Sequence, residues 1–88
     1  MKEIKSINVW FNGNNVLANR LMLTLNSGIL GESAIFAYAI YKFENDELSN
    51  QLISGLLTMD GDEYKKWGSD DEYVWEWAAN KLNLELIK

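Results

Sequence analysis

Two short acidic runs hold the residues with the clearest potential for chemistry in this sequence. Residues 60–63 are DGDE and residues 69–72 are SDDE. Clustered carboxylates can bind Ca²⁺ or Mg²⁺, and a suitably spaced pair can cleave a glycosidic bond. A calcium loop, however, needs oxygen ligands at alternate positions around a glycine over about twelve residues, and the DGDE run does not match that spacing.

Both runs match the start of a helix instead. In each, a capping residue is followed three positions later by a glutamate, so Asp60 and Ser69 are predicted to cap helices with Glu63 and Glu72 as reciprocal partners. Acidic side chains in a first turn also stabilise the helix dipole. We therefore expect solvated helix caps at both runs, with no metal site and no catalytic pair of acids.

The residue types that most often carry catalysis are missing. The sequence contains no histidine and no cysteine, so its serines lack their usual activating base. Its six glycines stand apart from one another, which does not match a glycine-rich phosphate loop. The sequence thus predicts a protein that is not an enzyme and that has no catalytic residues, cofactor or bound metal.

The net charge of −5 is confined to one segment. Residues 60–76 hold seven acids against Lys65 and Lys66, and the rest of the chain carries equal numbers of acids and bases. Proteins that bind nucleic acid need a basic face, so no direct nucleic-acid binding is predicted. The same acidic residues could instead imitate nucleic-acid phosphates and block the basic groove of a host nuclease or regulator.

Aromatic residues at helical spacing occupy the same segment. They are Tyr64, Trp67, Tyr73, Trp75 and Trp77. Such rings could stack on sugars or bases, but an apolar stripe beside a sheet is more typical of a core. Trp75 lies about 100–200° of helical rotation from Trp77, so the two cannot easily face the same sheet. We expect Trp77 in the core and Trp75 half exposed, in a position suited to a protein interface.

Alternating polar and apolar residues predict four strands before residue 60. Their ranges are 3–11, 16–25, 34–43 and 48–59. In the first, strict alternation places Ile4 and Val9 on opposite faces. The third has apolar groups on both faces, which predicts a central strand covered by a helix on one side and by a second surface on the other. Short connections favour antiparallel neighbours, and hence a β-meander.

The loop at 26–33 contains two apolar residues between its glycines, Ile29 and Leu30. They could fold over the core, or they could form a small contact patch for a partner.

Helices are predicted from about residue 61 to Trp67 and from about Asp70 to Leu82, with Gly68 as the stop between them. Residues 83–87 alternate again and are expected to rejoin the sheet as a short last strand. The predicted fold is a single α+β domain over residues 1–88: an antiparallel β-meander of four strands with two short C-terminal helices packed on one face.

No apolar run in the sequence is long enough to span a bilayer, and the alternating N-terminus differs from a cleaved signal peptide. We therefore expect no membrane insertion and no secretion through a cleaved leader.

The C-terminal third contains a tyrosine and a tryptophan three apart (Tyr64 and Trp67) and a predicted helix that ends in Lys81-Leu82-Asn83-Leu84. In these features it resembles the C-terminal part of some small phage and prophage proteins, mostly hypothetical or virion-associated. The resemblance covers about a third of the chain closely and brings no catalytic residues. Residues 70–77, DDEYVWEW, are more acidic than the pattern of those phage proteins predicts. The resemblance implies a phage-encoded module, located in the host cytoplasm or the virion.

Two functional hypotheses follow. The first is a non-enzymatic phage structural or accessory protein, such as a virion component. It would act through protein–protein contacts, either with virion proteins or with further copies of itself in a homo-oligomer. The second is the acidic nucleic-acid mimic. The candidate partner-binding residues are Trp75, Asp70, Asp71, Glu72, Ile29 and Leu30.

Overall fold

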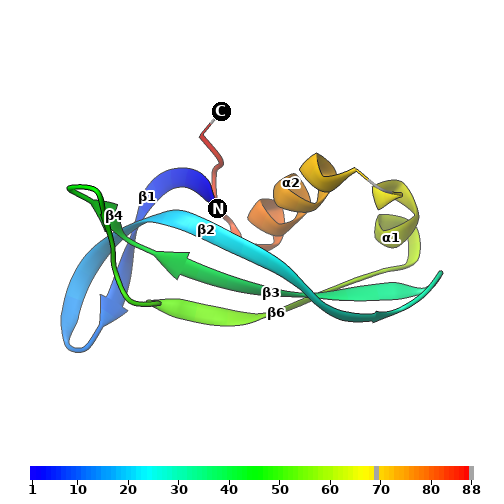
Figure 1. Cartoon of the computed structure of the whole chain (residues 1–88), viewed down its shortest axis with the longest axis horizontal. Coiled ribbons are helices and arrows are strands. Elements are labelled where there is room, and N and C mark those ends of the chain that lie inside the picture. Colours follow the sequence, from blue (N-terminus) through cyan, green and yellow to red (C-terminus); the bar gives the residue numbers. More distant parts are fainter. Residues whose placement is uncertain (69, 88) are drawn as a thin grey trace.

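A four-stranded antiparallel sheet forms the body of the protein. The computed structural model describes residues 1–68 and 70–87. The sheet contains β1 (Lys2–Phe11), β2 (Asn14–Ile29), β3 (Ser33–Tyr41) and β6 (Ile53–Asp60), in the order β1-β2-β3-β6 (Figure 1). Each strand pairs with the next of these along the chain, so the predicted meander is confirmed.

Two helices, α1 (Gly61–Trp67) and α2 (Asp71–Leu82), lie across one face of this sheet (Figure 1). The α+β class is therefore confirmed as predicted. Trp77 is 5% exposed and packs with Phe36 of β3, their ring centroids 5.8 Å apart. The core continues towards β1 through a second cluster that includes Ile4, Val9 and Leu21.

The faces of β1 differ from strict alternation. Ile4 and Val9 were predicted on opposite faces, but both are buried in the same cluster. The pairing of β1 with β2 shifts between Glu3 and Ile7, and this irregularity moves the buried positions from even to odd residues. An irregularity of this kind brings both apolar side chains to the core, which regular pairing would not do.

The predicted fourth strand is divided in two. A separate ribbon pairs β4 (Phe43–Glu44) with β5 (Glu47–Leu48), and β6 begins only at Ile53. The ribbon is attached to the sheet by Asn19, whose side-chain amide accepts from the Phe43 N–H at 2.8 Å and donates to the Phe43 carbonyl at 3.1 Å. The Arg20 guanidinium lies 4.7 Å from the Phe43 ring centroid. The polar stretch 49–52 thus lies outside the regular sheet.

The expected last strand is reduced to one antiparallel bridge, between Ile4 and Leu86. Two backbone hydrogen bonds accompany it: Lys5 N–H donates to Glu85 at 2.8 Å, and Ile87 N–H donates to Glu3 at 3.0 Å. The segment therefore covers the outer edge of β1 without adding a full strand to the sheet.

The helix caps differ from the prediction. Asp60 precedes α1 in an extended conformation, but its side chain makes no capping hydrogen bond. At α2 the capping residue is Asp70, whose Oδ1 accepts from the Glu72 amide at 3.1 Å. Ser69, the expected cap, lies outside the described residues. Glu63 was expected to complete a capping box and instead reaches α2, where its carboxylate accepts from Trp77 Nε1.

Candidate functional site

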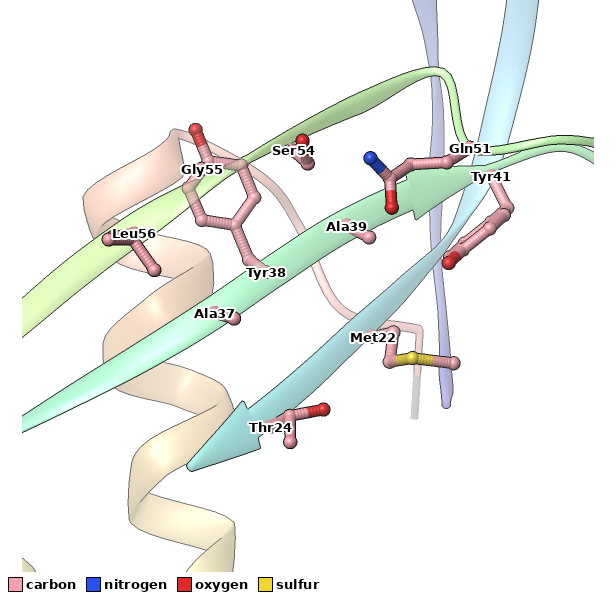
Figure 2. A pocket seen from close by; sticks show the side chains of 10 residues that line it. All are labelled: Met22, Thr24, Ala37, Tyr38, Ala39, Tyr41, Gln51, Ser54, Gly55 and Leu56. Atoms are coloured by element: carbon pink, nitrogen blue, oxygen red, sulfur yellow. The ribbon is translucent and has the colours of Figure 1, made fainter. Parts of the chain in front are cut away.

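The face of the sheet opposite the helices is uncovered, and we call it the open face. It is formed by alternate residues of the three strands β2, β3 and β6, whose cross-strand pairs include Met22 with Ala39 and Ala37 with Leu56. Figure 2 shows these side chains in front of the strands, with α2 behind. Its members are Met22, Thr24, Ala37, Ala39, Tyr41, Ser54 and Leu56.

A hollow of about 390 Å³ lies on the open face (Figure 2). Its floor is β3, where Ala37 and Ala39 present only methyl groups between the longer side chains of the neighbouring strands. Because small residues in a central strand leave space above them, this pattern produces a shallow depression. Leu56 is 62% exposed at its rim.

The side chains that line this hollow are suited to contact with another molecule, and they include few groups that commonly act in catalysis. Its polar groups are neutral hydroxyl and amide side chains, from Thr24, Tyr38, Tyr41, Gln51 and Ser54. No carboxylate, lysine or arginine is among the lining residues that the structure describes. A concave apolar surface edged by a few neutral polar groups is typical of a binding surface.

The expected patch at Ile29 and Leu30 is placed at the tip of the β2–β3 hairpin. Both side chains are exposed, Leu30 by 97%. Behind them lies a hollow of about 400 Å³, bounded on the other side by Tyr64 and Trp67 of α1. The Gly31 N–H donates to the Tyr64 hydroxyl at 3.1 Å, which ties the hairpin tip to the helix. These two residues therefore lie over a groove and do not fold into the core.

Trp75 lies half-buried against the cluster around Ile4. The Lys2 ammonium is 5.7 Å from its ring centroid, within the range of a cation–π contact. The same ammonium bonds Glu72 at 2.9 Å, so Lys2 joins these two predicted residues. Asp70 and Asp71 are exposed at the start of α2. Four of the six predicted residues thus belong to α2 or to its cap, and Ile29 and Leu30 lie apart from them at the hairpin tip. Trp75 and Glu72 share Lys2 as a partner, and Asp70 bonds the Glu72 amide.

The carboxylates do not gather into a metal site. Within residues 1–68 and 70–87, no group of three or more aspartate or glutamate side chains is placed to hold a metal ion.

Over the same described ranges, no helix combines the length and the apolar character needed to cross a membrane.

Sequence reasoning missed the open face, although one signal pointed to it. Apolar groups on both sides of β3 predicted a cover on each face, whereas the structure shows helices on one face only. Both helices reach β3 from that face, where Trp67 of α1 and Trp77 of α2 pack against Phe36. Trp10 was also not singled out, and it is 71% exposed on β1.

Comparison with known protein families, curated proteins and solved structures finds no match to this chain.

Proposed function

We propose that this chain is a non-enzymatic phage structural or accessory protein that works through protein–protein contacts, with the open face as its principal contact surface. The observation that carries the proposal is the unequal covering of the sheet. One face is packed under α1 and α2, while on the other Leu56 is 62% exposed and lies beside the hollow over Ala37 and Ala39. The phage context comes from the resemblance of the C-terminal third.

The uncovered residues favour a protein partner over a small substrate. The hollow is shallow and neutral, and it lies on the face of the sheet opposite the two helices. Contiguous exposed apolar surface on a small domain commonly marks a protein contact. A protein partner would supply the second cover that the composition of β3 predicts.

The test is incorporation into particles of the phage that carries the gene. Mass spectrometry of purified particles should find the protein at a constant ratio to the major virion proteins. Thr24→Lys adds a charge beside the hollow on an exposed position and should abolish incorporation. Asn8→Lys makes the same change on exposed β1 outside the hollow and should not. Absence of the native protein from particles, or equal behaviour of the two variants, would reject the proposal.

The acidic mimic is the second candidate, favoured by the exposure of Asp62, Asp70 and Asp71 on consecutive helices. Two other acids are engaged within the chain, since Glu72 pairs with Lys2 and Glu63 lies 3.5 Å from Lys81. A mimic must bind a basic groove electrostatically, so its affinity should fall steeply with salt. Charge reversal at Asp70 and Asp71 should abolish such binding, and a salt-insensitive complex would exclude this function.

A further inference from the structure

We propose that β6 is a dimerisation edge at which a second copy of this chain pairs antiparallel, with Leu56 opposite Leu56 of the partner. The inference goes beyond the proposed function, because it concerns the chain's own assembly and holds whether or not a phage particle is involved. The two edge strands of the sheet, β1 and β6, differ in how they are protected from pairing with another chain.

The β1 edge is protected. The C-terminal segment covers it through the Ile4–Leu86 bridge and the hydrogen bonds of Lys5 and Ile87. Charged residues line the same strand at Lys2, Glu3 and Lys5. Covering segments and charges are the usual means by which proteins prevent an edge strand from pairing with another chain.

The β6 edge has neither kind of protection. β6 is the last strand in the sheet order, so among the described strands it pairs with β3 alone. Residues 48–59 include no charged residue and no proline, and the pairing of β6 with β3 contains no register shift. A flat, uncharged edge with free backbone N–H and C=O groups is a template for strand addition.

The symmetry of the sheet limits the possible registers. In an antiparallel pair, residues directly opposite one another have their side chains on the same face of the sheet. If a two-fold axis perpendicular to the sheet relates the two copies of β6, one residue of β6 must therefore lie opposite its own symmetry mate, and the axis passes beside that residue. The centre of the strand lies between Leu56 and Leu57. An axis at Leu57 would place Ser54 opposite Asp60. An axis at Leu56 pairs residues 53–59 of the two copies with one another, all of them uncharged, and leaves Asp60 outside this overlap.

The Leu56 register is also self-complementary. It brings the exposed Leu56 side chains of the two copies together, and it sets Ser54 opposite Thr58, where two hydroxyl groups can hydrogen-bond. Burial of an exposed leucine against its symmetry mate stabilises the pair through the hydrophobic effect.

Charge repulsion does not oppose this arrangement. Helix α1, with Asp62 and Glu63 in its first turn, follows β6 directly, so antiparallel pairing places the two copies of it at opposite ends. With about 3.4 Å per residue, Asp60 and its symmetry mate are roughly 27 Å apart along the strands. This exceeds the screening length of about 8–10 Å at physiological salt. The same symmetry puts both open faces on one side, which joins the two hollows into a continuous surface over eight strands.

The test uses charge pairing at the axis. Sedimentation equilibrium should show a dimer for the native chain. L56K and L56E should each weaken dimerisation at least about tenfold, because like charges then meet across the axis. An equimolar mixture of the two should form a heterodimer, since opposite charges now meet. Leu17→Lys, at another exposed leucine but on the interior strand β2, should leave the dimer intact.

A second measurement fixes the register. The chain has no cysteine, so Leu56→Cys introduces a single thiol, and mild oxidation should produce a covalent dimer. Thr58→Cys alone should not cross-link, but its mixture with Ser54→Cys should. A native chain that stays monomeric up to millimolar concentration, even if it takes up a peptide strand, overturns the proposal. So does a dimer that L56K leaves unchanged, or that cross-links through Thr58→Cys alone.

Discussion

The indole N–H of Trp77 donates a hydrogen bond to the carboxylate of Glu63, and this contact joins the two helices above the sheet. Trp77 is buried by Phe36 of β3, while Glu63 sits in the first turn of α1 and also approaches Lys81. The sequence position of Glu63 predicts a helix-capping role, but its carboxylate makes a tertiary contact instead. It accepts from the Trp77 indole N–H, which would otherwise be buried without a hydrogen-bond partner.

Removal of the Glu63 carboxylate should destabilise the fold measurably. Glu63→Ala leaves the Trp77 N–H buried with no acceptor, which costs about 1–3 kcal/mol in the free energy of unfolding. Glu63→Gln keeps an acceptor oxygen and should lose less than half as much. Urea denaturation followed by tryptophan fluorescence checks both variants. Equal losses would show that the hydrogen bond to Trp77 is not the stabilising element.

Trp77→Ala should largely unfold the domain. Deleting a buried indole costs about 3–5 kcal/mol, which is a large part of the roughly 5–10 kcal/mol of stability typical of a chain this size. Trp10→Ala is the matched control, because that indole is 71% exposed and should change the stability by less than about 0.5 kcal/mol. A thermal melt of Trp77→Ala shifted by only a degree or two would contradict the core position.

Gly28→Ala should cost more than Gly55→Ala. A Cβ at Gly28 would lie 2.6 Å from the carbonyl oxygen of Ser33, a backbone atom held in the β2–β3 hairpin. A Cβ at Gly55 would meet the ring and hydroxyl of Tyr38, which can turn aside. We expect a loss of about 1–3 kcal/mol for the first and a smaller loss for the second, measured by thermal denaturation. The reverse order would contradict the close approach at Gly28.

Asn19→Ala should release the β4–β5 ribbon while the sheet stays folded. The Asn19 amide is bonded to both the N–H and the carbonyl of Phe43, so its loss frees the ribbon from β2. Hydrogen exchange by mass spectrometry should become faster across residues 43–48, with little change in β3. Asn15→Ala, at an exposed asparagine of the same strand, serves as the control and should leave that exchange unchanged.

The elements of the fold were largely predictable because they depend on local patterns. Alternation placed β1, β2 and β3 within four residues of their observed bounds, although the fourth predicted strand was divided and the last is only a bridge. Gly68 ends α1 with a positive φ, as expected from a residue without a Cβ. Short connections between successive strands made the antiparallel order the natural one. The core position of Trp77 followed from its helical spacing.

What the amino-acid sequence determined by itself is therefore the order and approximate bounds of β1, β2, β3 and the two helices, since each depends on residues a few positions apart. Only the tertiary structure decided that Ile4 and Val9 share one core, that Glu63 bonds Trp77, and that Ala37 and Ala39 lie on the face of the sheet opposite the helices. These outcomes depend on register shifts and on which face the helices cover. Both are set by contacts between residues far apart in the chain, on which local periodicity carries no information.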